Sequence, residues 1–262
     1  MTLGLKYTEW LEDQKWMQKG DVVYVISDVL DLAIFMKKQG TRINLDEIID
    51  RLQYLVGTQG TLLFPTFNWG FCKGEVFDYN RTPSKTGSLS SRALQRSDFV
   101  RTQHPIYSFA VWGHHKDELL NNECVNSFGE KTIFEDLYKW NSKVLVIGLP
   151  ALKGLTYIHH VEQSVGVPYR YNKGFTGMYI DSEGHKREKT YYMYVRDLDM
   201  NPQPINCFEP LEQKMYQQNT ISQAEYMGIP HEFLKIRELD KAVKADIVYN
   251  NSQNMYTYNN KA

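Results

Sequence analysis

Two adjacent histidines and a carboxylate stand within one short stretch of the chain, residues 154–163. If this stretch is helical, His159 and Glu162 lie three residues apart on one face, so that the imidazole and the carboxylate can meet. A carboxylate bonded to one ring nitrogen fixes the tautomer and leaves the other nitrogen free to take a proton. The stretch therefore predicts a general base, with a metal site or two buried rings, His159 and His160, as the alternatives.

Two other kinds of site use the same residue types. Zinc on a helix would favour the HExxH pattern, which is absent, and no spaced Cys or Asp partners stand near His159, so a metal is not expected. A Ser-His-Asp hydrolase would need GxSxG at a strand-to-helix turn, and the chain has no such sequence. What remains is a base that deprotonates a substrate group directly.

Apolar runs in the chain predict the elements that must position this base. A buried strand is expected at 143–150, directly before the histidines, and further strands at 21–28 and 60–67 with a helix at 44–57 between them. Strand, helix and strand in succession favour a right-handed crossover. The predicted fold is α/β, with three layers, α/β/α, around a central and largely parallel sheet.

The C-terminal half of the chain has a different character. Residues 165–208 are rich in Tyr and Arg, and the turn residues 181–184 between two strand-like segments predict an antiparallel excursion. The polar tail, 250–262, is rich in Asn and Tyr and is expected to be frayed. Because no repeat or linker divides the chain, residues 1–262 are interpreted as a single domain.

Residues that can touch a ligand follow two of the predicted strands where each strand ends. Ser27 and Asp28 follow the first, and Thr66 and Phe67 follow the second. Ligands in open parallel sheets gather at the carboxyl ends of strands, although small polar residues there also cap helices and turns. The loop 82–90 offers hydroxyls and amides to a phosphate, but it lacks the glycine spacing of a Walker motif.

Composition argues against several classes of partner. The 262 residues include 30 basic and 31 acidic side chains, so no global field favours nucleic acid or an anionic membrane. No apolar run approaches the ~18 residues of a membrane span, and the N-terminus does not resemble a signal peptide. Three distant cysteines without a CxxC pair indicate reduced thiols. The expected location is the cytoplasm.

Taken together and in order, these motifs resemble the aminoglycoside 3-N-acetyltransferase family, whose members depend on acyl-CoA. The resemblance covers about residues 20–165 and continues weakly through 167–170. It is carried by five pieces in register: 20–27, 60–67, 82–87, 101–105 with Ser108, Ala110 and Gly113, and Thr156 with His159 and Glu162.

The resemblance implies roles for individual residues. His159, oriented by Glu162, would activate the acceptor amine, and Ser84 is a further catalytic candidate. An amine that attacks a thioester loses a proton, and the thioester oxygen becomes an oxyanion that needs donors. The cleft for the pantetheine arm and the thioester would be formed by residues of the strand ends and loops: Ser27, Thr66, Phe67, Thr86, Arg101 and His104.

The co-substrate implied by the resemblance is an acyl-CoA, either acetyl-CoA or a short hydroxyacyl-CoA, with no metal. A homodimer is a further expectation from the family. No nucleic-acid or membrane partner is expected.

Departures from the family pattern bear on the acceptor. Antibiotic-modifying members usually read His-Ser-Ser-Leu where this chain has Ile-Ser-Asp-Val at 26–29. A near-neutral chain with Tyr and Arg concentrated at 168–196 suits an acceptor other than a polycation, because Arg grips a diphosphate and Tyr stacks on a base. Asp28, Tyr169 and Arg170 are the candidate substrate-binding residues.

The prediction is therefore N-acylation of a nucleotide-linked amino-deoxysugar for surface polysaccharides, by direct attack of the amine on the thioester. Aminoglycoside 3-N-acetylation is the second hypothesis. A sugar- or nucleotide-binding module without catalysis is the third.

Overall fold

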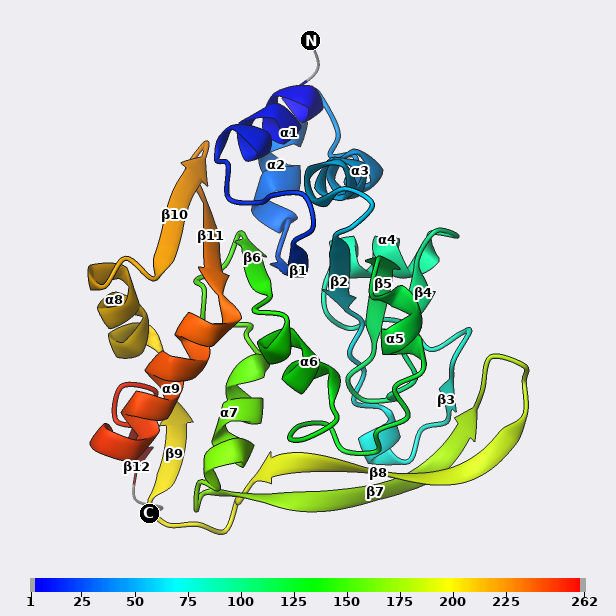
Figure 1. The fold of residues 1–262 in the computed structure, drawn as a ribbon, viewed down its shortest axis with the longest axis vertical. Coiled ribbons are helices and arrows are strands. Elements are labelled where there is room, and N and C mark those ends of the chain that lie inside the picture. Colours follow the sequence, from blue (N-terminus) through cyan, green and yellow to red (C-terminus); the bar gives the residue numbers. More distant parts are fainter. Residues whose placement is uncertain (1–2, 260–262) are drawn as a thin grey trace.

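The computed structural model describes residues 3–259, and its main sheet has seven strands in the order β10-β11-β6-β1-β2-β5-β4 (Figure 1). The predicted strands at 21–28, 60–67 and 143–150 are confirmed as β1, β2 and β6. The strands are Val22–Ser27 (β1), Thr61–Pro65 (β2), Phe77–Asp78 (β3), Val100–Arg101 (β4), Phe109–Gly113 (β5), Lys143–Ile147 (β6), Arg170–Ile180 (β7), Lys186–Arg196 (β8), Gln203–Asn206 (β9), Ile221–Tyr226 (β10), Ile229–Lys235 (β11) and Tyr256–Asn259 (β12).

Parallel pairing is confined to the centre of this sheet. The strand β1 runs parallel to β2 and β6, whereas β2 with β5, β5 with β4, β6 with β11 and β11 with β10 are antiparallel. The α/β class is confirmed, but the expectation of a largely parallel sheet is corrected to a mixed one. A tight turn explains one edge: Met227 and Gly228 both have positive φ, 52° and 79°, which suits a two-residue hairpin and so fixes β10 antiparallel to β11.

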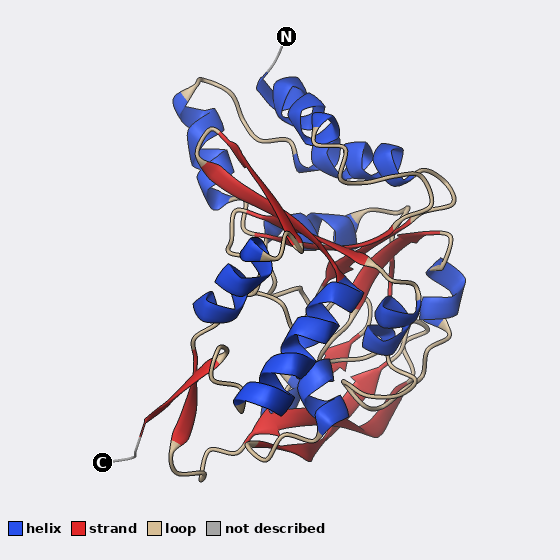
Figure 2. Cartoon of the chain, turned by 60° about the vertical axis from the view of Figure 1, so that its left-hand side comes forward, coloured by secondary structure: helices blue, strands red, loops and turns tan. Residues whose placement is uncertain are grey.

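Helices cover both faces of the main sheet and make the three layers (Figure 2). The first four pack on one face against Val23, Val25 and Phe64, and the remaining five pack on the other against Tyr24 and Val146. No helix in the described part of the chain is long and apolar enough to cross a membrane. The helices are Leu3–Asp13 (α1), Leu30–Lys38 (α2), Leu45–Val56 (α3), Ser88–Gln95 (α4), Lys116–Leu120 (α5), Ile133–Lys139 (α6), Tyr157–Val165 (α7), Glu209–Gln217 (α8) and Ile236–Asn250 (α9).

The expected antiparallel excursion is the long hairpin of β7 and β8, whose strands pair from Arg170 opposite Arg196 to Ile180 opposite Lys186. The short strand β3 adds to it in parallel, and the turn at 181–184 lies where the sequence predicts it. Figure 1 shows this hairpin running past the lower end of α7. The hairpin therefore brings the residues that follow α7 back against that helix.

The C-terminal segment corrects the expectation of a frayed tail. The strand β12 pairs with β9, and Met255 and Tyr256 are buried, at 0% and 1% exposure. Residues 260–262 lie outside the described residues. The tail has few aliphatic side chains, but the Tyr256 ring packs against Phe208 and Tyr169 and its hydroxyl donates to the buried carboxylate of Glu162. These contacts add to the strand pairing and hold the segment in place.

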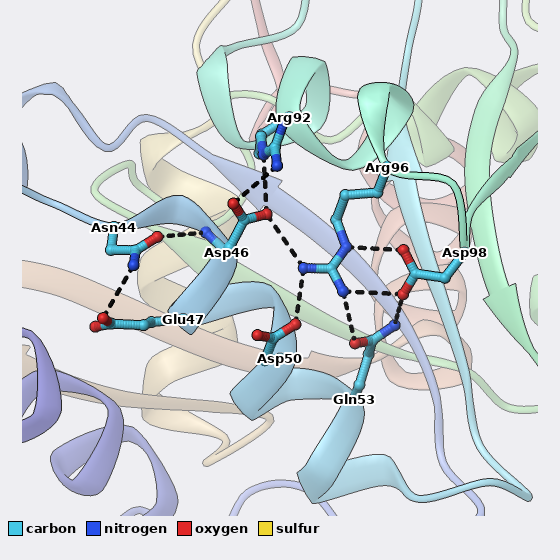
Figure 3. A network of polar contacts seen from close by, with 8 residues as sticks. All are labelled: Asn44, Asp46, Glu47, Asp50, Gln53, Arg92, Arg96 and Asp98. Atoms are coloured by element: carbon cyan, nitrogen blue, oxygen red, sulfur yellow. Dashed lines mark hydrogen bonds and ion pairs between the residues drawn. The ribbon is translucent and has the colours of Figure 1, made fainter.

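A polar network fixes α4 against α3 (Figure 3). Arg92 donates two hydrogen bonds to the carboxylate of Asp46, and Arg96 contacts Asp46, Asp50 and Asp98. The hydrogen bond from Arg96 lowers the pKa of the Asp98 carboxyl to about 2. Partly exposed ion pairs contribute little singly, but here one guanidinium bridges three carboxylates. The network therefore holds the C-terminal end of α4 against α3.

Candidate active site

A cleft of about 710 Å³ opens at one edge of the main sheet. It is lined by residues at the carboxyl ends of β1 and β2, by the loop after β6, and by the first residues of α2, α4 and α7. The carboxyl ends of parallel strands meet at one edge of a sheet, and the helices that follow begin there. Because first-turn N–H groups have no partners within the helix, such an edge suits a ligand that carries negative charge.

His159 lies in the first turn of α7, and its side chain is one-quarter exposed at the wall of the cleft. Its Nδ1 atom lies 2.7 Å from Oε2 of Glu162, so the predicted pairing of these residues on one helical face is present. A carboxylate only accepts, so Nδ1 donates and Nε2 is left to accept a proton. Burial lowers the pKa of the imidazole, although Glu162 acts in the opposite direction. The ring is thus neutral at neutral pH, as a base must be.

Glu162 is completely buried and receives donors on both carboxylate oxygens. Arg170 forms an ion pair with Oε2 at 2.8 Å, while the hydroxyls of Tyr169 and Tyr256 donate to Oε1 at 3.1 and 2.5 Å. Burial alone would raise the pKa of Glu162, but the hydrogen bond from His159 and the charge of Arg170 outweigh it and lower the pKa. The carboxylate is therefore held ionised, and it orients His159 without taking its proton.

Tyr169 and Arg170 are not among the residues that line the cleft, and a role for them in substrate binding stays a prediction. The Tyr169 hydroxyl lies between Glu162 and Ser252, and the Arg170 guanidinium also donates to the Tyr194 carbonyl at 3.2 Å. Both side chains are buried, Tyr169 at 3% exposure and Arg170 at 7%. A buried carboxylate needs such partners, and the first residue of β7 and the residue before it provide them.

Four other candidates do line the cleft: Ser27, Asp28, Phe67 and Thr86. The Ser27 hydroxyl is buried without a hydrogen-bond partner among residues 3–259. Asp28 is exposed and accepts a hydrogen bond from the Leu30 amide at 3.0 Å, at the start of α2. The positions of Ser27, Asp28 and Phe67 agree with the rule that strand ends meet at the ligand-binding edge, whereas Thr86 reaches the cleft from the loop before α4.

Close backbone approach at the start of α4 requires a glycine. Gly87 has φ of 98°, and a Cβ atom there would lie 2.9 Å from the Ser27 carbonyl oxygen. Another side chain would both strain the backbone and push α4 away from β1. The glycine therefore lets the N-terminus of α4 reach the cleft.

Ser84 lies in the loop before α4, next to the cleft wall and outside the residues that line it. Its hydroxyl is 2.9 Å from the Thr86 hydroxyl and accepts a hydrogen bond from the Thr86 amide at 3.2 Å. In this position it orders the loop that presents Thr86 to the cleft. A catalytic role for Ser84 stays a prediction.

Thr66, Arg101 and His104 lie behind the cleft wall. Arg101 is buried and donates to the Thr82 carbonyl at 2.5 Å and to the Ser108 hydroxyl at 3.1 Å, and burial lowers its pKa to about 10. Thr66 bonds the same Ser108 hydroxyl at 2.9 Å. The His104 ring accepts two backbone amides through Nδ1, and burial lowers its pKa to about 3. The structure thus places these three in a framework that supports the cleft loops and does not bring them to its surface.

The other histidine of the pair, His160, faces away from the cleft. Its Nδ1 atom accepts a hydrogen bond from the Gly129 amide at 3.2 Å, and burial lowers its pKa to about 4. Among the residues that the structure describes, no group of three or more His, Cys, Asp and Glu side chains is arranged to hold a metal ion.

Several cleft residues have no motif that would identify them in the sequence. Lys85 and Lys153 add positive charge, and Trp69 and Phe208 add aromatic rings. Tyr256 reaches Glu162 from the end of the chain. Lys85 stands inside the motif at 82–87 and could have been noted there, but only the folded chain brings the others to the site.

Comparisons with known proteins agree with this architecture. A profile of the family described as aminoglycoside 3-N-acetyltransferase matches residues 36–245. The chain is 36% identical over 76 residues to the SPbeta prophage-derived aminoglycoside N(3')-acetyltransferase-like protein YokD of Bacillus subtilis strain 168. That alignment spans 28% of this chain and 28% of the relative.

Solved structures are similar over almost the whole chain. AAC-IIIb in a binary complex with CoASH aligns with a TM-score of 0.72 and 17% identity, over 87% of this chain and 90% of that one. The crystal structure of YokD from Bacillus subtilis aligns with a TM-score of 0.72 and 20% identity, over 92% of this chain and 97% of that one. The structure of AAC-VIa bound to sisomicin aligns with a TM-score of 0.74 and 15% identity, over 93% of this chain and 96% of that one. At these identities the likeness is one of fold.

Proposed function

Because the chain belongs to the aminoglycoside 3-N-acetyltransferase family, a family of acetyl-CoA-dependent enzymes, we propose that it transfers an acyl group from CoA to the amino group of a nucleotide-linked amino-deoxysugar. One observation carries the transferase part of this proposal: His159 stands in the cleft wall with its Nδ1 atom 2.7 Å from the buried carboxylate of Glu162. The Nε2 atom is then available to a bound amine.

In the proposed reaction the neutral amine attacks the thioester carbon while His159 Nε2 accepts its proton. A C–N bond forms, the tetrahedral intermediate collapses, and the C–S bond breaks. The proton on His159 passes to the departing thiolate, so the enzyme ends as it began. The oxyanion on the thioester oxygen needs donors. The Ser27 hydroxyl, which has no hydrogen-bond partner among residues 3–259, is our first candidate. The Ser84 hydroxyl is the second and would give up its contact with Thr86 to donate, whereas the Thr86 hydroxyl already donates to the Pro65 carbonyl.

The charges around the cleft support an acyl-CoA as the donor. CoA carries phosphates, and Lys85 and Lys153 line the cleft beside the N-termini of α2 and α4. Lysine is a common phosphate ligand, and helix N-termini favour anions. A short acyl chain, acetyl or hydroxyacyl, is proposed with it.

The same charges support an acceptor that is not a polycation. Asp28 is the one carboxylate among the described residues that line the cleft, where it stands with two lysines. An aminoglycoside carries several ammonium groups and would meet more positive than negative charge there. A nucleotide-linked sugar carries a diphosphate and one amine, and Trp69 and Phe208 offer rings on which its base can stack. Nucleotide-linked sugars are activated for glycosyl transfer, so we place the product in surface-polysaccharide synthesis.

A thiol-release assay tests the proposal. Acetyl-CoA and a short hydroxyacyl-CoA would be offered with dTDP-linked amino sugars in one series and with kanamycin-type amines in another, and the product identified by mass. We expect release with the nucleotide-linked sugars, and a kcat about 10²–10⁴-fold lower in the His159→Ala variant. Turnover with aminoglycosides alone would reject the proposed acceptor in favour of the second hypothesis. No turnover with any acyl-CoA would reject the transferase and favour a binding module.

A further inference from the structure

The strand β12 returns the end of the chain to the helix that carries the proposed base. Tyr256 on this strand is 1% exposed, and its hydroxyl donates to Oε1 of Glu162 at 2.5 Å. The two residues are 94 positions apart in the sequence. Tyr256 also lies beyond residues 36–245, the part of the chain that the family profile matches. The profile therefore says nothing about this contact.

The same strand is tied to the wall of the cleft. Tyr256 pairs with Asn206 of β9, and its ring lies 6.0 Å from that of Phe208, edge to face. Asn206 and Phe208 both line the cleft. The segment around β9 thus lines the cleft through Asn206 and Phe208, and its partner strand β12 contacts the buried carboxylate through Tyr256.

The carboxylate of Glu162 has three hydrogen-bond donors and one ion-pair partner, Arg170. His159 and Arg170 lie on Oε2, and Tyr169 and Tyr256 lie on Oε1. A hydrogen bond to a carboxylate stabilises its negative charge and weakens its attraction for other protons. Each tyrosine hydroxyl therefore weakens the attraction of Glu162 for the proton on Nδ1 of His159. Each also restricts the orientation of the carboxylate plane.

We propose that Tyr256 is a positioning residue for the proposed reaction, which holds Glu162 in the orientation that presents His159 to the acceptor amine. The kinetic part of this proposal rests on the proposed function. Its structural part, the coupling of Tyr256 to the ionisation of His159 through Glu162, does not.

Every ionisable group that faces this pair enters the expected pH dependence. These groups are Tyr169 just before β7, Arg170 at the start of β7, Arg196 and Tyr194 on β8, and Tyr256 and Tyr258 on β12. In Tyr256→Phe all of them but the Tyr256 hydroxyl remain. Glu162 then has one donor fewer and holds protonated His159 more firmly, so the pKa of His159 should rise.

The experiment compares Tyr256→Phe with Tyr258→Phe. Tyr258 stands on the same strand, but its hydroxyl donates to the Asn251 carbonyl at 3.4 Å, not to Glu162. The first readout is an NMR titration of the His159 imidazole, assigned by its loss in His159→Gln. We expect Tyr256→Phe to raise the His159 pKa by about 0.5–1 pH unit and Tyr258→Phe to leave it unchanged.

The second readout is kinetic. Tyr256→Phe should lower kcat about 10-fold with KM for acyl-CoA nearly unchanged, and shift the acidic limb of the kcat profile to higher pH. A His159 pKa that is the same in the wild type and Tyr256→Phe, or that moves equally in both variants, would overturn the proposal. Absence of turnover would count against the proposed function alone, because the titration needs no substrate.

Discussion

Replacing Glu162 by glutamine removes a single negative charge from the centre of the site while keeping the size of the side chain. The Glu162 side chain is 0% exposed, and its ion-pair partner, the Arg170 side chain, is 7% exposed. Breaking a buried pair by removing one partner costs about 3–5 kcal/mol, because the other charge stays buried. We therefore expect Glu162→Gln to lose about that much unfolding free energy, and to lose the lock on the His159 tautomer as well.

The loss of rate should have a different origin from the loss of stability. Without Glu162, burial is the main influence left on the pKa of His159, and it lowers that pKa, so the ring stays neutral at neutral pH. The fall in kcat, by about 10²–10⁴, then reflects lost orientation and not lost ionisation. Arg170→Met in the Glu162→Gln background removes the orphaned charge, so it should restore much of the stability and none of the rate.

Urea unfolding and thiol release at saturating acyl-CoA measure the two effects on the same four proteins: wild type, both single variants and the double variant. Recovery of kcat together with stability in the double variant would refute the reasoning. It would mean that Glu162 serves the reaction only by keeping the fold intact. A stability loss well below 1 kcal/mol in Glu162→Gln would equally contradict the buried ion pair.

Three further predictions follow from the surroundings of the cleft. Burial raises the pKa of Glu232, which lies under the loop after β6, to about 7, so its contribution to stability is lost as pH rises from about 4.5 through 7. Glu232→Gln should abolish that loss, at most about 3 kcal/mol, and urea unfolding at pH 5 and pH 8 measures it. Lys85→Gln should raise KM for acyl-CoA about 10-fold if Lys85 binds a phosphate, whereas Lys186→Gln at the far end of the hairpin should not, as steady-state kinetics will show. Arg101→Met leaves buried carbonyls without donors and should cost about 3 kcal/mol in unfolding experiments. An increase in KM without loss of stability would instead favour the cofactor role that the sequence predicts for Arg101.

The parts of the site that the sequence predicted are those held by local geometry. His159 and Glu162 meet because positions three apart share a helical face, and that rule needs no tertiary information. Likewise β1, β2 and β6 are apolar runs whose burial on both faces of the sheet follows from composition. Ser27 and Phe67 reach the cleft because the carboxyl ends of β1 and β2 converge there.

What the sequence could not provide depends on contacts between distant segments. From the sequence, Arg170 is a cation that could bind a substrate. Only the packing of β7 against α7 shows that Arg170 forms an ion pair with Glu162. The strand β10 was not predicted, because a mixed edge strand such as 221–226 alternates polar and apolar residues only weakly. The tail was expected to fray because it is polar, yet one tyrosine with a buried acceptor holds it.

The three hydrogen-bond donors and the arginine around Glu162 also explain how a buried carboxylate can orient a base without competing with it for the proton. A carboxylate isolated in the interior would have a raised pKa and would itself take the proton from His159. Arg170 and two tyrosine hydroxyls supply the solvation that water would otherwise give, so Glu162 remains ionised. The proton that His159 accepts from an amine then stays on His159 Nε2, facing the cleft, where the departing thiolate can collect it. For the proposed reaction, the remote residues that could not be seen in the sequence are therefore the ones that decide where the proton rests.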